Sequence, residues 1–230
     1  GDVAAVLCEP AMTNIGMVLP EPDFMQALRA ITRRHGTLLI IDETHTISTG
    51  PRGYTGAHGL EPDLFVVGKP VAGGVPASVW GFTDEVAQRL DAVRSQTPPG
   101  HSGMGTTLSA NALSLAAMRA TLEHVMTAEA YAHMESLAGA LAAGLQAVVD
   151  QYGMAWHVVR VGARVEFICA PGPLRNGTEA EAAHAPALFA RGVGRVLAAE
   201  HADLAEYRFT PYVRIAAEVC LQMHLLNLSF

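Results

Sequence analysis

The chain of 230 residues contains little lysine, little cysteine and few aromatic residues. Of its 15 basic side chains, only Lys69 is a lysine, and the others are arginines. An arginine supplies positive charge equally well, but its guanidinium stays protonated and cannot act as an amine nucleophile. A lysine can form a Schiff base with a carbonyl. A single lysine in an arginine-rich sequence can be due to chance. Whether Lys69 is reactive must therefore be judged from the residues around it.

Basic charge, paired cysteines and long apolar runs are also scarce. The net charge is -7, so the chain does not have the basic surface that nucleic-acid binding requires. Its three cysteines have no C-x-x-C spacing, which argues against a disulfide framework or a zinc cage and favours a cytoplasmic location. No apolar run approaches the roughly 20 residues of a membrane span, and no signal segment opens the chain. The histidines show no metal-ligand spacing, so no metal site is expected.

The first half of the chain alternates short apolar runs with helical patterns. This alternation is typical of a parallel sheet covered by helices. The predicted strands are residues 3–7, 37–41, 64–67 and 78–82. A helix is predicted to begin at Pro22-Asp23 and to end at Gly36, where a left-handed cap is needed. The glycine-rich passage 50–59 is predicted to be a loop.

The second half has a different texture, with long alanine- and leucine-rich helices at 109–126 and 128–151. Strands are predicted at 156–161 and 165–170, and a further helix near 187–201. The chain starts without an initiator methionine and enters an apolar run at once, so we expect it to be a fragment. We expect residues 1–125 to be part of a large α/β domain with a mainly parallel sheet. A bridging helix at 126–152 and part of a small α+β domain at 153–230 follow.

An acid and the single amine follow two of the predicted strands. Asp42 comes directly after strand 37–41, and Lys69 follows strand 64–67 after one glycine. Ligands bind at the carboxyl ends of strands in open parallel sheets. A pyridoxal phosphate enzyme needs this pair, because a lysine holds the cofactor and an aspartate keeps the pyridine nitrogen protonated. An isolated acid in this position is more often a helix cap or salt-bridge partner, so the interpretation depends on the pair.

A glycine- and threonine-rich segment precedes the helix predicted to begin near Ser109. Residues 103–109 contain two glycines, which let the backbone approach a phosphate, and threonine hydroxyls that can donate to it. The same segment also reads as an ordinary loop followed by a helix cap.

Four motifs resemble those of class III aminotransferases in their order and spacing, and within that class the glutamate-1-semialdehyde aminomutase-like branch. They are Cys8-Glu9-Pro10, Leu39-Ile40-Ile41-Asp42-Glu43-Thr44-His45-Thr46, Val67-Gly68-Lys69-Pro70 with Gly73-Gly74, and Gly105-Thr106-Thr107-Leu108-Ser109-Ala110-Asn111. The resemblance covers about residues 1–125 well and continues more loosely through Arg175-Asn176-Gly177. It implies the three-layer α/β sandwich of fold type I pyridoxal phosphate dependent transferases.

The resemblance also implies roles for single residues. Lys69 matches the Schiff-base lysine, which also moves the proton between the substrate and the cofactor. Asp42 matches the partner of the pyridine nitrogen. Thr44 falls at the position where the family packs a valine or similar side chain on the face of the cofactor ring. His45 falls at the position where a glutamine or histidine of the family reaches the phenolic oxygen of the cofactor. Glu43 is expected to be structural, held by backbone donors or an arginine.

Two further residues complete the implied site. Thr107 matches a threonine that binds the cofactor phosphate across a dimer interface, so a homodimer is part of the expectation. Glu9 matches a glutamate that lines the pocket. The family's main phosphate loop lies in an amino-terminal segment that these residues do not contain, which predicts weak cofactor binding by this chain.

We therefore expect transfer of an amino group between two small molecules, an amino acid or amine donor and a keto or aldehyde acceptor, with pyridoxal 5'-phosphate held on Lys69. The residues do not separate aminotransferase from aminomutase, decarboxylase or epimerase uses of the same frame. The alternative is a catalytically silent fragment or remnant of such an enzyme, acting at most as a dimerising scaffold.

Overall fold

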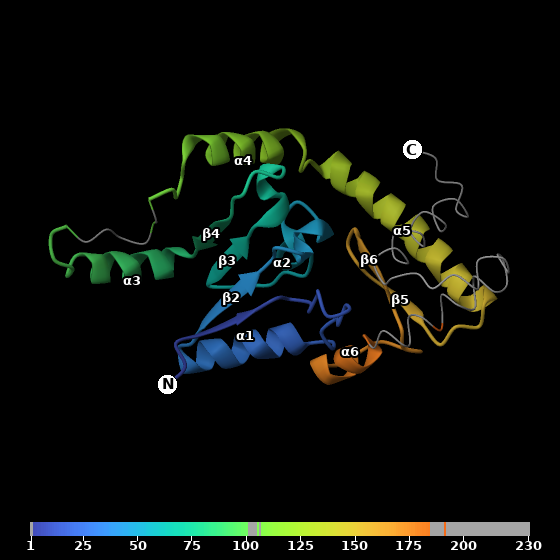
Figure 1. Cartoon of the computed structure of the whole chain (residues 1–230). Helices are drawn as coiled ribbons and strands as arrows, with labels where there is room; N and C mark the ends of the chain where they lie inside the picture. The colour runs from blue at the N-terminus through green and yellow to red at the C-terminus, as the bar shows by residue number, and fades with distance from the viewer. Residues whose placement is uncertain (1, 101–104, 106, 185–190, 192–230) are drawn as a thin grey trace. The chain divides into compact units, whose positions relative to one another are not determined.

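The computed structural model describes residues 2–100, 105, 107–184 and 191. The strands are β1 (Ala5–Cys8), β2 (Leu38–Asp42), β3 (Leu64–Val67), β4 (Val79–Phe82), β5 (His157–Val161) and β6 (Arg164–Ile168). The helices are α1 (Phe24–His35), α2 (Gly53–Ala57), α3 (Asp84–Arg94), α4 (Ala112–His124), α5 (Ala128–Gln151) and α6 (Gly177–Ala183) (Figure 1). Two 3-10 helices are η1 (Thr46–Thr49) and η2 (Lys69–Ala72).

The first four strands form one sheet in the order β1-β2-β3-β4. β1, β2 and β3 run parallel, and β4 pairs with β3 in the antiparallel sense. The α/β fold with a mainly parallel sheet is thus confirmed. In the register, Cys8 lies opposite Ile41 and Asp42 opposite Val66, so the carboxyl ends of the three parallel strands meet at one edge.

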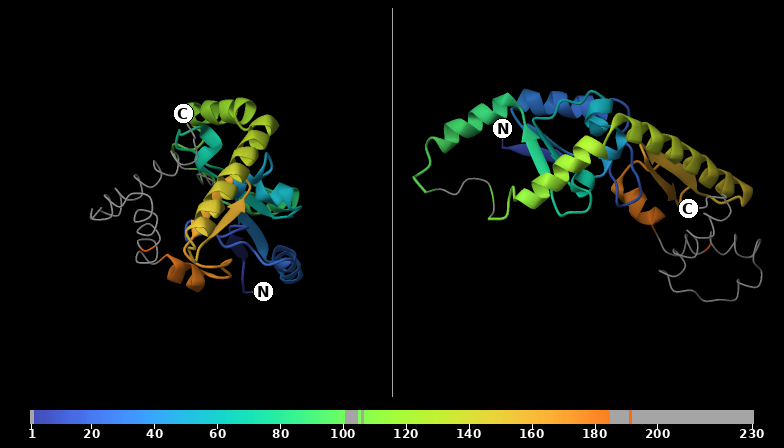
Figure 2. Two further views of the ribbon diagram at one scale, coloured as in Figure 1. Left: turned by 90° about the vertical axis from the view of Figure 1, so that its right-hand side faces the viewer. Right: turned by 90° about the horizontal axis from the view of Figure 1, so that it is seen from above.

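The core on the α1 side of the sheet is built around the central strand β2. Leu39 and Ile41 are buried and pack against Met25 of α1. Helix α1 lies beside β1 and β2 (Figure 1), and further views of the chain are given in Figure 2. Burying side chains of this size contributes about 1.5–3 kcal/mol each, so this contact sets the position of the strand that ends at Asp42.

A second apolar cluster joins the segments that follow β2 and β3. Ile47 of η1, Val67 at the end of β3 and Val71 of η2 are buried together, with Met118 of α4 packed against them. The backbone after β2 and the backbone after β3 are therefore held against each other by one small core. Its members Ile47 and Val71 follow Asp42 and Lys69 closely in the chain, so the cluster adjoins the edge that carries these two residues.

The prediction that passage 50–59 is a loop is wrong, because α2 lies within it. The amide groups of Tyr54 and Thr55 donate to the buried carboxylate of Glu43. First-turn amides of a helix have no partner inside the helix, so an acceptor aimed at them stabilises even a short helix. Glycine content alone does not reveal this distant acceptor.

The start of α4 also differs from its predicted position. Asn111 is the N-cap and its side chain accepts from the amide of Ser114 at 2.9 Å. The helix therefore begins at Ala112, and residues 107–110 form a turn. Helices α3 and α6 were not predicted, whereas the bounds predicted for 64–67 and 128–151 are those observed. The helix predicted near 187–201 lies almost entirely outside the described residues.

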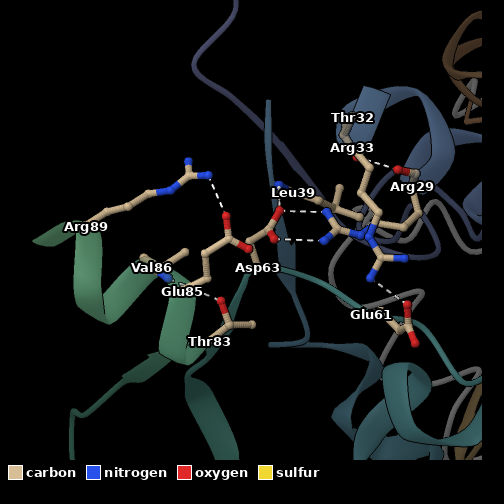
Figure 3. A network of polar contacts seen from close by, with 10 residues as sticks. All are labelled: Arg29, Thr32, Arg33, Leu39, Glu61, Asp63, Thr83, Glu85, Val86 and Arg89. Carbon is tan, nitrogen blue, oxygen red and sulfur yellow. Dashed lines mark hydrogen bonds and ion pairs between the residues drawn. The ribbon is translucent and has the colours of Figure 1, made fainter. Parts of the chain in front are cut away.

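A polar network ties α1 to the beginning of β3 (Figure 3). Arg29 donates to both carboxylate oxygens of Asp63, at 2.6 and 2.8 Å, and the amide of Leu39 donates to Asp63 at 2.7 Å. Burial alone would raise the pKa of Asp63, but the hydrogen bonds from Arg29 and Leu39 outweigh it and lower the pKa. The network holds the amino-terminal end of the strand that leads to Lys69.

The chain falls into two compact units, and the first contains the described residues within 2–14, 19–139 and Arg160–Val165. The second contains Ile15–Val18, Ala140–Val159 and the residues from Glu166 onward. Within it, the amide of Val158 donates to Gln146 at 3.0 Å, which ties β5 to α5. Strands β5 and β6 form a two-stranded sheet. The division of the chain at residues 126 and 153 stays a prediction.

Candidate active site

Lys69 occupies an unusual backbone conformation at the carboxyl end of β3. Its φ is 48°, in the left-handed region that a side chain rarely adopts, and it is the first residue of η2. Such strain costs about 1–3 kcal/mol and persists where the surrounding structure enforces it. Here Val71 and Ala72, both buried, hold the rest of η2 in place. Lys69 itself is exposed at the sheet edge.

Asp42 is the last residue of β2, on the strand next to the one that leads to Lys69. One carboxylate oxygen, Oδ1, accepts from the amide of Thr44 at 2.8 Å. Within the described part of the chain, no basic side chain pairs with Asp42, and Oδ2 has no hydrogen-bond partner. The hydroxyl of Thr44 accepts from the amide of Gly68 at 3.2 Å and so joins the two strand ends directly.

His45 lies between Lys69 and two residues that follow β1. Its Nε2 contacts the Nζ of Lys69, and its Nδ1 contacts the Oγ1 of Thr13. The hydroxyl of Thr13 donates to Oε2 of Glu9 at 2.6 Å. The structure therefore joins three of the residues singled out from the sequence through a fourth, Thr13, that sequence reasoning missed. The sequence signal for Thr13 was weak, namely a hydroxyl close behind a predicted strand.

Glu43 is a fully buried carboxylate, with 0% of its surface exposed. It accepts from the hydroxyl of Thr46 at 2.6 Å and from the amides of Tyr54 and Thr55, the former at 3.0 Å. The expectation that Glu43 is held by backbone donors is confirmed. Burial and the charge of Glu43 both raise the pKa of Tyr54. Glu43 holds the turn between Asp42 and His45 in one conformation.

Thr107 is not brought to the other predicted residues by any hydrogen bond that the structure describes. It lies exposed in the turn before α4. Gly103, Met104 and Thr106 of the predicted phosphate segment lie outside the described residues.

A cavity of about 230 Å³ lies away from this edge, on the α1 side of β2. Its lining includes Met25, Arg29 and Ile41, and none of the predicted site residues. The candidate site is therefore the strand edge that carries the reactive groups Asp42, His45 and Lys69, and not this cavity. Among the described residues, no helix is long and apolar enough to cross a bilayer, and no cluster of acid, histidine or cysteine side chains has the form of a metal site.

The donor set at this edge fits the cofactor that the sequence implies. The amine of Lys69 can hold an aldehyde, and the imidazole of His45 lies beside it. Oδ2 of Asp42, which has no hydrogen-bond partner among the described residues, can face a pyridine nitrogen. Asp42, His45 and Lys69 are the residues that would contact the reactive ring.

The chain is similar in sequence to enzymes named glutamate-1-semialdehyde 2,1-aminomutase. Glutamate-1-semialdehyde 2,1-aminomutase from Sorangium cellulosum is 38% identical over 204 residues, which are 84% of this chain and 44% of the relative. The enzyme of that name from Anaeromyxobacter dehalogenans strain 2CP-1 is 36% identical over 183 residues, covering 78% of this chain and 40% of the relative. The chain thus spans about 40 to 44% of the length of these relatives.

Solved structures similar to this chain include glutamate-1-semialdehyde-aminomutases and an aminotransferase. A glutamate-1-semialdehyde-aminomutase from Pseudomonas aeruginosa PAO1 has 53% identity and a TM-score of 0.78, covering 85% of this chain and 44% of that one. A variant of a glutamate-1-semialdehyde-aminomutase from the same organism was solved in complex with PMP. A β-phenylalanine aminotransferase from Variovorax paradoxus has 29% identity and a TM-score of 0.71, covering 86% and 45% of the two chains.

The family model for class III aminotransferases matches residues 1–198, which is most of the chain. The resemblance first seen in four short motifs is thereby confirmed, and the chain belongs to the class III aminotransferase family.

Proposed function

We propose that this chain carries the lysine-bearing edge of a pyridoxal phosphate dependent enzyme that moves an amino group between an amino acid or amine and a keto or aldehyde acceptor. The observation that carries the proposal is the single lysine at the end of β3, held in a left-handed conformation with an imidazole against its amine. Membership of the class III aminotransferase family supports it.

Lys69 would hold the cofactor as a Schiff base through Nζ and afterwards act as the base and acid at the substrate carbon. When bound, pyridoxal phosphate supplies an aldehyde for attachment and a ring that withdraws electrons from the substrate. Oδ2 of Asp42 would hold the proton on the pyridine nitrogen. The bond from the amide of Thr44 to Oδ1 orients the carboxylate for this role.

The remaining residues would shape the pocket. The methyl group of Thr44 would pack on the ring, His45 would reach the phenolic oxygen as well as the amine, and Glu9 would line the wall. In a homodimer, Thr107 would bind the phosphate group of the cofactor that the neighbouring subunit holds. Two exposed leucines beside it, Leu108 at 77% and Leu113 at 69% exposure, support an interface at the start of α4.

The proposed reaction is limited to the movement of an amino group, which the names of the similar proteins have in common. Similar proteins are named for an aminomutase and for a β-phenylalanine aminotransferase, so the proposal covers both transfer and internal relocation of the amino group. A cytoplasmic location is part of the same proposal, in keeping with a sequence that has three cysteines and no C-x-x-C spacing.

Borohydride trapping tests the proposal directly. The chain is incubated with pyridoxal phosphate, reduced with borohydride and digested, and the labelled peptide is identified by mass spectrometry. We expect a visible absorbance band that reduction removes, and a label on Lys69. The control Lys69→Arg keeps the charge and should take no label there. An unlabelled Lys69 in folded protein would refute the enzymatic proposal and favour a catalytically silent scaffold.

A further inference from the structure

We infer that Glu9, Thr13 and His45 form a hydrogen-bonded relay that fixes His45 as the proton acceptor for the Lys69 amine. The inference deepens the proposed function, because it rests on Lys69 being the reactive lysine. Its basis is a continuous line of polar contacts in the first compact unit, from the carboxylate of Glu9 to the amine of Lys69.

The members of the relay come from three strand ends that the sheet brings together. Glu9 follows β1, His45 follows β2 by three residues, and Lys69 follows β3 after one glycine. Thr13 is 3% exposed, and the side chains of His45 and Glu9 are 16% and 34% exposed. The inner members are thus shielded, and the relay reaches solvent through the Glu9 end and the Lys69 end.

The direction of each hydrogen bond follows from the groups themselves. The hydroxyl of Thr13 donates its proton to Oε2 of Glu9 at 2.6 Å, because an ionised carboxylate can only accept. With its proton used, Oγ1 can serve Nδ1 of His45 only as an acceptor, so Nδ1 must carry a proton. In the neutral ring Nε2 then carries a lone pair, and this is the atom that contacts Lys69.

This arrangement has a chemical consequence for the amine. A lysine ammonium can donate one proton to Nε2 of His45: the N–H bond at Nζ breaks, an N–H bond forms at Nε2, and the electron pair stays on Nζ. The amine becomes a nucleophile and the ring becomes an imidazolium. Its positive charge is offset by Glu9, whose Oε2 lies 3.6 Å from Nδ1. Thr13 acts as a positioning residue, because it sets the tautomer and does not touch the reacting atoms.

The charged groups that contact His45 are the Glu9 carboxylate on one side and the Lys69 amine on the other. Without Thr13, Glu9 at 3.6 Å is too distant for a good hydrogen bond to the ring. The Thr13 hydroxyl, oriented by the carboxylate of Glu9, therefore favours the imidazole tautomer that carries its proton on Nδ1. A valine at position 13 would keep the volume and remove this link.

The tautomer of His45 in the cofactor-free protein is the first test. Long-range proton–nitrogen NMR spectra of imidazoles distinguish a proton on Nδ1 from one on Nε2, and His45→Gln assigns the signal. We expect the neutral ring of His45 to carry its proton on Nδ1. Thr13→Val should abolish that preference, Thr13→Ser should keep it, and the control Thr32→Val, which removes another buried hydroxyl remote from the site, should leave it unchanged. A proton on Nε2 in the unmodified protein would overturn the inference.

The reactivity of Lys69 is the second test, and the single lysine makes it clean. The protein is treated with a small amine reagent such as trinitrobenzenesulfonate near neutral pH, and modification of the Lys69 peptide is followed by mass spectrometry. We expect Thr13→Val, Glu9→Gln and His45→Gln to slow the reaction about tenfold or more, below the full effect of a positioned base. Thr13→Ser should react as fast as the protein without substitutions, and so should Thr32→Val.

Circular dichroism on each variant separates a lost relay from a lost fold. Folded Thr13→Val and Glu9→Gln proteins that react at the unmodified rate would refute the relay. The proposed function fails separately, because it depends on whether pyridoxal phosphate and borohydride label Lys69 at all.

Discussion

Replacing Glu43 with glutamine should destabilise the fold strongly, although the change is nearly isosteric. In the structure Oε2 accepts from the Thr46 hydroxyl and the Tyr54 amide, and Oε1 accepts from the Thr55 amide. A glutamine must place its NH₂ group against one of these oxygen positions. Its least costly orientation faces the amide of Thr55, where a donor then meets a donor.

The magnitude follows from the bonds that change. Losing one hydrogen bond to a charged acceptor costs about 1.5–3 kcal/mol, and leaving a buried amide unsatisfied costs about 1–3 kcal/mol. Removing the charge of Glu43 from a fully buried position offsets part of this loss. We expect Glu43→Gln to lower the free energy of unfolding by about 2–4 kcal/mol, a large share of the total for a domain.

Urea denaturation followed by circular dichroism measures this free energy. Glu61→Gln is the matched control, because Glu61 forms an exposed ion pair with Arg33 and its loss should cost about 0–1 kcal/mol. If Glu43→Gln unfolds at the same urea concentration as Glu61→Gln, the buried carboxylate does not organise the turn and the reasoning is refuted.

Three further predictions test other parts of the structure by the same denaturation assay. Gly53→Ala should cost more than Gly36→Ala, by roughly 1–3 kcal/mol, because both glycines have positive φ but only at position 53 would a Cβ lie 2.6 Å from Glu43; equal costs would contradict this. Lys69→Gly should be more stable than Lys69→Ala by about 1 kcal/mol, since glycine relieves the left-handed conformation; an alanine variant of equal stability would argue against strain there. The lowered pKa of Asp63 means that its ionised form stabilises the fold above the ordinary pKa of about 4, and that this contribution is lost as pH falls through the lowered value. Asp63→Asn should therefore destabilise the protein more at pH 7 than near pH 3, and a pH-independent difference would refute the assignment.

Local patterns in the sequence predicted the parallel core of the sheet well. Inner strands such as β3 are continuous apolar runs in the sequence, and α5 shows its length through an unbroken helical composition. Glycine-rich stretches were predicted less well, because a short helix such as α2 depends on an acceptor from another segment. The predicted start of α4 was early because Asn111, and not Ser109, is its cap.

The sequence by itself determined which chemistry this protein can carry. A single lysine after one apolar strand and an acid after its neighbour follow from composition and strand ends, which are local properties. Only the tertiary structure decided how these groups meet. Thr13 and His45 are 32 residues apart in the chain, and His45 and Lys69 are 24 apart. Their contacts depend on the order and register of β1, β2 and β3, because parallel pairing brings distant strand ends to the same edge.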